Sequence, residues 1–143
     1  MTKRIEEALD DLIAQARRAA QQSYSPYSGF KVGAALRLTN GEVVIGTNVE
    51  NVSYGLTICA ERAALVAAVS RFGPEIRVNA VAVVNLNGSA SPPCGACRQV
   101  LAEFIEPEAP VTFPAADGMR VMPFLAIMPL AFEMDLKKRD SQS

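Results

Sequence analysis

Histidine is absent from this chain of 143 residues, and cysteine occurs only three times. Without histidine the chain can form neither a Ser-His-Asp triad nor a Cys-His nucleophile pair. A small, odd number of cysteines argues against a disulfide framework. We therefore expect reduced thiols and a cytoplasmic location, where disulfides are rare.

A charge surplus and long apolar runs are also missing. The 14 lysines and arginines are balanced by 15 acidic residues, whereas nucleic-acid-binding proteins normally carry a basic surplus. No stretch approaches the roughly 18 apolar residues that cross a bilayer. The segment after Met1 has acids already at Glu6-Glu7 and no long apolar run, so it does not resemble a signal peptide. We expect no nucleic-acid or membrane partner, and we interpret Lys137-Lys138-Arg139 as a solvated tail. The length predicts a single domain over residues 1–143.

Apolar residues recur at helical spacing near the N-terminus and predict an amphipathic helix over residues 3–22. Two β-prone segments, 31–38 and 42–49, flank Asn40-Gly41, a pair typical of tight hairpin turns. The later predicted elements are a helix over 59–72, a buried strand over 78–86, a helix over 94–104, two antiparallel strands near 110–113 and 119–124, and a short helix after Pro129. This order predicts an α/β fold whose sheet carries helices on both faces.

The three cysteines stand at two predicted helix starts, in Cys59-Ala60-Glu61 and in Pro93-Cys94-Gly95-Ala96-Cys97. Three thiolates can hold a zinc ion and leave its fourth position open for water, and Glu61 can handle the protons of that water. The helix N-termini lower thiol pKa values, and the Arg62 guanidinium can balance further negative charge. The pattern matches the Cys-or-His, x, Glu … Pro-Cys-x-x-Cys signature of zinc-dependent deaminases.

Other interpretations of these residues are open at this point. Cys94 and Cys97 fit a redox pair, Cys59 fits a buried core thiol, and Glu61 fits a carboxylate that complements a helix dipole. A purely structural zinc site would need a fourth protein ligand, and the chain has no fourth cysteine and no histidine. The clustering of all three cysteines therefore favours one catalytic zinc ion per chain.

Further motifs accompany the zinc signature. They are Tyr24-Ser25-Pro26-Tyr27-Ser28, Phe30-Lys31-Val32-Gly33-Ala34-Ala35-Leu36, Asn48-Val49-Glu50-Asn51, Tyr54-Gly55-Leu56-Thr57-Ile58 before Cys59, Arg98-Gln99-Val100-Leu101 after Cys97, and Met128-Pro129-Leu130-Ala131-Phe132. With them, residues 24–135 resemble the small, free-nucleoside class of cytidine deaminases. The resemblance implies a three-layer α/β/α sandwich around a mixed five-stranded sheet of cytidine deaminase-like type, with its last two strands antiparallel.

The resemblance also implies a reaction, the zinc-dependent deamination of cytidine and 2′-deoxycytidine to uridine and 2′-deoxyuridine in pyrimidine salvage. Zinc on the three cysteines would activate water for attack on C4 of cytosine, with Glu61 as the proton shuttle. The implied substrate-binding residues are Phe30 and the Ala60 backbone at the base, and Asn48 with Glu50 at the ribose hydroxyls. An amide and a carboxylate suit a diol, because one donates and the other accepts hydrogen bonds.

The class resembled is a homotetramer, which implies active sites shared between subunits, with Tyr54 and Phe132 reaching a neighbour's site. Three rival functions stay open: a deaminase of another aminopyrimidine such as blasticidin S, a polynucleotide deaminase, and a non-catalytic zinc or redox module. Asn48 with Glu50 favours a nucleoside over blasticidin S. The near-neutral charge and the antiparallel last strands disfavour a polynucleotide, and Glu61 disfavours a non-catalytic module.

Overall fold

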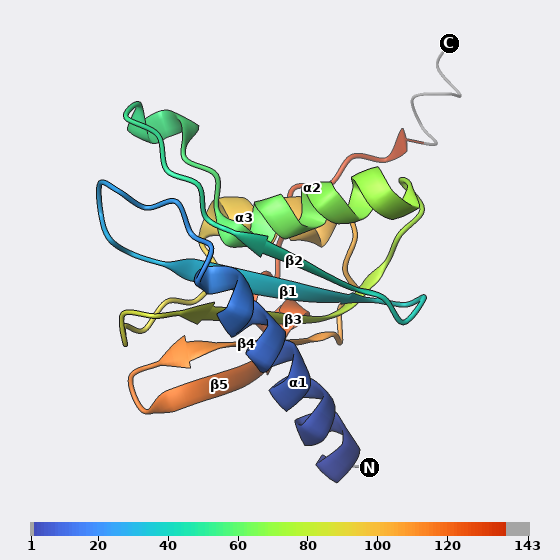
Figure 1. Cartoon of the computed structure of the whole chain (residues 1–143). Coiled ribbons are helices and arrows are strands. Elements are labelled where there is room, and N and C mark those ends of the chain that lie inside the picture. Colours follow the sequence, from blue (N-terminus) through green and yellow to red (C-terminus); the bar gives the residue numbers. More distant parts are fainter. Residues whose placement is uncertain (1, 137–143) are drawn as a thin grey trace.

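The computed structural model describes residues 2–136, in which five strands form one mixed sheet in the order β2-β1-β3-β4-β5 (Figure 1). The strands are β1 Val32–Leu38, β2 Val43–Thr47, β3 Val78–Asn85, β4 Pro110–Ala115 and β5 Gly118–Pro123. The helices are α1 Thr2–Ala20, α2 Ala60–Phe72, α3 Gly95–Ala102 and α4 Phe124–Ile127, with a 3-10 turn η1 at Tyr54–Leu56. All five predicted strands and the first three predicted helices are confirmed, with ends shifted by one or two residues.

The strand directions follow from the connections between them. Strand β1 pairs antiparallel with both β2 and β3, and β4 pairs antiparallel with β5. Strands β3 and β4 are parallel, and the segment between them contains α3. The prediction that the last two strands are antiparallel is confirmed, because the short turn at Ala116-Asp117 allows no crossover.

Helix α1 packs on one face of the sheet. Leu9, Leu12 and Ala16 from its predicted apolar stripe are buried against that face. Gly33 in β1 permits the close approach, since a Cβ at this position would collide with the backbone of Ala16. The stripe and the glycine together dock the helix directly over β1.

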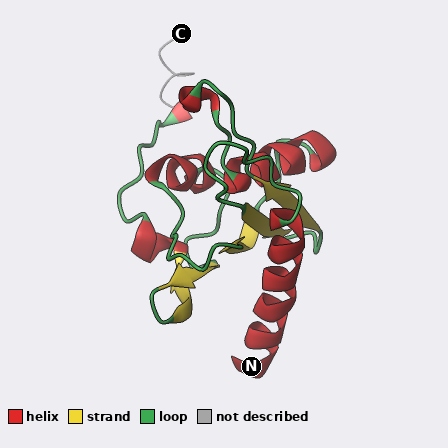
Figure 2. Cartoon of the chain, turned by 60° about the vertical axis from the view of Figure 1, so that its left-hand side comes forward, coloured by secondary structure: helices red, strands yellow, loops and turns green. Residues whose placement is uncertain are grey.

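Helices α2 and α3 cover the opposite face, so the sheet lies between two helical layers (Figures 1 and 2). Gly46 lets α2 approach β2, because a Cβ there would collide with the backbone of Ala64. Strand β3 is buried on both faces, with Val81 in the core under α2 and α3 and Ala82 in the core under α1. The predicted three-layer arrangement is confirmed, and it brings both cysteine-bearing helix starts to the same side of the sheet.

The helix predicted after Pro129 does not begin directly after this proline. Leu136 is helical, and the residues that follow it lie outside the described ones, so a helix in that part of the chain stays a prediction. Residues 128–135 contain neither helix nor strand, and α4 lies before this proline. Leu130 is 91% exposed, so a helix here would bury little apolar surface against the sheet. The tail Lys137-Lys138-Arg139 lies outside the described residues. No helix within residues 2–136 is both long and apolar enough to cross a membrane.

Candidate active site

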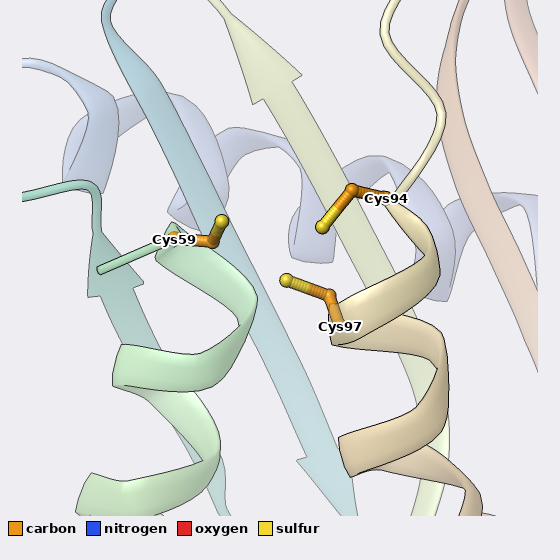
Figure 3. A group of neighbouring side chains, drawn as sticks. All are labelled: Cys59, Cys94 and Cys97. Carbon is orange, nitrogen blue, oxygen red and sulfur yellow. The ribbon is translucent and has the colours of Figure 1, made fainter. Parts of the chain in front are cut away.

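Three sulfur atoms converge between the starts of α2 and α3 (Figure 3). Cys59 is the N-cap residue of α2, Cys94 is the N-cap residue of α3, and Cys97 lies in the first turn of α3. Their Sγ atoms all lie within 4.8 Å of one another. The structure therefore brings together all three residues that the sequence assigns to the metal.

The two helix starts position these thiols through ordinary capping geometry. Ala63 N donates to Cys59 O and Arg98 N donates to Cys94 O, each over 3.0 Å, which closes the first turn of each helix. The remaining backbone N–H groups of the two first turns give both helix ends partial positive charge, directed at the sulfurs. This field favours thiolates over thiols.

Hydrogen bonds distinguish the thiols from one another. A hydrogen bond from Cys97, with further help from Arg62, lowers the pKa of the Cys59 thiol to about 5. The same hydrogen bond, together with burial, raises the pKa of the Cys97 thiol. Of these two thiols, Cys59 is therefore the one that ionises first.

The donor set fits one zinc ion. Zinc binds thiolate sulfur at about 2.3 Å with tetrahedral geometry, which places ligand sulfurs about 3.8 Å apart. Sulfurs already within 4.8 Å reach that geometry by small side-chain rotations. Three soft ligands leave the fourth position open, as in catalytic zinc sites.

Glu61 lies one helical position beyond Ala60 in the first turn of α2, and its side chain is buried at 4% exposure. Burial raises the pKa of Glu61, and the negative charge of Cys59 adds to the rise. A raised pKa makes a carboxyl group easier to protonate than one in water, and a group that both takes and releases a proton is what proton-transfer catalysis requires.

A pocket of about 270 Å³ adjoins the cysteines. Seven predicted site residues line it: Phe30, Asn48, Glu50, Cys59, Ala60, Glu61 and Cys94. The sequence analysis gave no site role to the other lining residues, which are Val32, Thr57, Val83, Ser91 and Pro92, although Val32 and Thr57 belong to motifs quoted there. Ser91 and Pro92 directly precede the Pro93-Cys94 motif, and that adjacency is the signal that could have identified them.

Asn48 is held by three contacts that leave part of its amide unused. Its Oδ1 accepts hydrogen bonds from Val32 N at 3.0 Å and from the Ser23 hydroxyl, and its Nδ2 donates to Phe30 O at 2.8 Å. An amide nitrogen has two donor hydrogens. One N–H of Asn48 therefore stays available to a ligand in the pocket.

Glu50 is held just as firmly, by the turn that precedes Phe30. Its Oε1 accepts hydrogen bonds from Tyr27 N at 3.0 Å and Ser28 N at 3.1 Å, and its Oε2 accepts one from the Ser28 hydroxyl. The Ser28 hydroxyl hydrogen bond lowers the pKa of Glu50, which keeps the carboxylate ionised. Oε2 retains an acceptor position, so Asn48 and Glu50 offer one donor and one acceptor to a ligand.

Four predicted site residues lie outside the pocket lining. Cys97 is buried. Arg62 donates from Nη2 to Cys59 Sγ over 3.4 Å. Tyr54 and Phe132 are 69% and 75% exposed, and they are not among the residues that line the pocket of their own chain.

Phe132 is nevertheless fixed by a pair of hydrogen bonds that the sequence did not reveal. Gln99 Nε2 donates to Phe132 O at 3.0 Å, and Phe132 N donates to Gln99 Oε1 at 3.1 Å. One side-chain amide on α3 thus holds both backbone groups of an exposed aromatic residue 33 positions later. The adjacent motif residue Arg98 likewise ties the cysteine loop to α4, through Pro93 O at 2.7 Å and Ile127 O at 2.8 Å.

A family model and curated relatives all match this chain to the same protein family. Residues 6–112 match the cytidine and deoxycytidylate deaminase zinc-binding region. The cytidine deaminase of Halalkalibacterium halodurans is 53% identical over 92 residues, which cover 64% of this chain and 68% of that protein. The cytidine deaminase of Sporosarcina psychrophila is 47% identical over 103 residues, 72% of this chain and 74% of that protein.

Solved structures agree with this result. The crystal structure of cytidine deaminase from Burkholderia pseudomallei is similar with a TM-score of 0.77 and 43% identity, over 86% of this chain and 98% of that one. The cytidine deaminase from Mycobacterium tuberculosis gives a TM-score of 0.74 and 43% identity, over 88% and 98% of the two chains.

Proposed function

Because this chain belongs to the cytidine and deoxycytidylate deaminase family, we propose that it hydrolyses cytidine and 2′-deoxycytidine to uridine and 2′-deoxyuridine with release of ammonia. One observation carries the proposal. A three-thiol metal site, a buried carboxyl group and a donor–acceptor pair suited to a sugar diol border one pocket. Each of these groups matches one requirement of nucleoside deamination.

Cys59, Cys94 and Cys97 hold one zinc ion in this proposal. Bound zinc supplies a Lewis acid that makes water nucleophilic at neutral pH. The protein's part is to supply thiolates already biased toward ionisation by two helix N-termini. Arg62 balances the surplus negative charge through its contact with Cys59.

Glu61 moves the protons. A buried carboxyl group beside the cysteines can take a proton from the attacking water and deliver it to N3 of the cytosine ring. It then takes the proton of the hydroxyl group now on C4 and delivers it to the amino group. The C4–N bond breaks and a C4 carbonyl forms, so water and cytidine become uridine and ammonia. Burial raises the pKa of Glu61 above that of an ordinary carboxyl group, which makes the protonated form easier to reach and so supports both transfers.

The remaining lining residues orient the nucleoside. Phe30 packs against the base, and the Ala60 backbone contacts the pyrimidine. Asn48 donates a hydrogen bond to one sugar hydroxyl. Glu50 accepts a hydrogen bond from that hydroxyl or from the adjacent hydroxyl of the sugar. Both polar side chains are already held by the protein, which lowers the entropy lost when substrate binds.

We also propose that residues 1–143 act as one domain within a homotetramer that shares its active sites. Tyr54 and Phe132 support this assembly, because both are large and exposed and neither lines the pocket of its own chain. In it, Phe132 reaches the base in a neighbour's site. The reduced thiol ligands support a cytoplasmic role in pyrimidine salvage.

The decisive test is an ultraviolet assay for cytidine loss with parallel measurement of ammonia and zinc. We expect turnover of cytidine and 2′-deoxycytidine by protein that holds about one zinc per chain. Blasticidin S and a single-stranded oligonucleotide serve as competing substrates. Zinc-loaded protein that releases ammonia faster from either competing substrate than from cytidine would contradict the proposal. Zinc-loaded protein that releases no ammonia from any of these substrates would contradict it as well.

A further inference from the structure

Phe30 lies in the short segment between the first loop and β1, and a residue far along the chain holds both of its neighbours. Asn87 Oδ1 accepts a hydrogen bond from Lys31 N at 3.0 Å. Asn87 Nδ2 donates to Gly29 O at 3.1 Å. One carboxamide, 56 and 58 residues away in sequence, thus bridges the two residues that flank Phe30.

Asn87 is itself well placed for this task, directly after β3. Leu86 N donates to Lys31 O at 3.0 Å, which carries the pairing with β1 beyond the end of the strand. Asn87 N donates to Asn85 Oδ1 at 3.0 Å, and Gly88 follows with a φ of 70°, a left-handed conformation suited to glycine. The turn therefore fixes the carboxamide against the Phe30 segment.

Both backbone groups of Phe30 form hydrogen bonds with side chains near the residues proposed to bind the sugar. Phe30 N donates to the Ser28 hydroxyl at 3.0 Å, and Phe30 O accepts from Asn48 Nδ2 at 2.8 Å. With the two Asn87 contacts, the backbone is held before, at and after Phe30. A side chain on such a backbone has few staggered positions to choose from, and the ring of Phe30 lines the pocket.

We propose that Asn87 is a positioning residue that sets the ring of Phe30 for contact with the cytosine base. The inference rests on the proposed function, in which Phe30 packs against the base. Asparagine suits the position because its carboxamide presents a donor and an acceptor side by side. Aspartate has the same shape but lacks the donor, and its carboxylate would repel Gly29 O.

Asn87→Asp tests the proposal, with Asn40→Asp as the matched control. Asn40 is also an exposed asparagine followed by glycine, and it contacts Glu42 N in the β1–β2 hairpin. We expect Asn87→Asp to raise the KM for cytidine roughly three- to tenfold, with kcat within about twofold of wild type. We expect KM to change more than kcat because the metal ligands and Glu61 come from the starts of α2 and α3, which Asn87 does not contact. The control should leave both constants unchanged.

A double-mutant cycle with Phe30→Ala separates positioning from general damage. If Asn87 acts through the ring, Asn87→Asp should change KM little once the ring is removed. If the effects of Asn87→Asp and Phe30→Ala on the KM for cytidine add fully in the double variant, the proposal is overturned. It is also overturned if Asn87→Asp has the same KM as the control Asn40→Asp. Asn87→Ala repeats the test if the melting temperature of Asn87→Asp falls well below the wild-type value. Zinc-loaded wild type that is inactive on cytidine would instead overturn the proposed function and this inference with it.

Discussion

Arg62 donates a hydrogen bond to the sulfur of Cys59, over 3.4 Å from Nη2 to Sγ. The same nitrogen lies 3.5 Å from Thr57 O, which holds the guanidinium beside the start of α2. Zinc with three thiolates carries a net negative charge, which opposes the activation of water. A fixed cation on one of the three sulfurs reduces that charge without occupying a coordination position.

Replacing Arg62 with glutamine should weaken zinc binding or activity by about 10- to 100-fold, the usual effect of losing a partner of a metal ligand. Competition with a chromogenic chelator measures the zinc affinity. Arg71→Gln is the control, since Arg71 lies at the far end of the same helix and contacts the Phe72 ring. Equal zinc affinity and equal activity in both variants would show that Arg62 has no role at the metal.

Glu61→Gln should keep zinc and fold, but its kcat should fall by about 10²–10⁴-fold, the usual contribution of general acid–base catalysis. Glutamine keeps the size of the side chain but cannot carry a proton between water, N3 and the amino group. Steady-state rates and zinc content should be measured together, with exposed Glu42→Gln as the control. Activity within about tenfold of wild type would mean that another group moves the protons.

Glu50→Ala should weaken turnover of cytidine far more than that of free cytosine, if cytosine is turned over at all. Glu50 is assigned to the sugar, and removing it leaves polar groups of the site unpaired at a cost of roughly 1–3 kcal/mol. The comparison uses kcat/KM for both substrates in both proteins. An equal loss on the two substrates would remove Glu50 from the sugar site.

Phe132→Ala should reduce activity even though Phe132 does not line the pocket of its own chain. In the proposed tetramer this ring completes a neighbour's site. Mixing inactive Glu61→Gln subunits with Phe132→Ala subunits should restore part of the activity, because some mixed sites combine an intact Glu61 with an intact Phe132. If subunit exchange is confirmed and no activity returns, Phe132 acts within its own chain or only in packing.

Local patterns in the sequence were enough to predict most of the elements. The spacing of Leu9, Leu12 and Ala16 predicted the buried stripe of α1, and Asn40-Gly41 predicted the β1–β2 hairpin. These predictions succeeded because each depends on residues that are neighbours within one helix or one turn. The helix predicted after Pro129 does not begin within residues 128–135, a stretch in which the side chains of Leu130 and Phe132 are exposed.

The chemistry of the metal site follows from the residue types alone. Three cysteines at two helix starts, with no histidine in the chain, already specified the donor atoms and the carboxyl group beside them. The contacts that hold the proposed substrate-binding residues appear only in the tertiary structure: Asn87 around Phe30, Ser28 on Glu50 and Gln99 on Phe132. Contacts such as those of Asn87 and Gln99 join residues that are far apart along the chain. Their existence depends on strand order and on how helices dock, which no short stretch of sequence encodes.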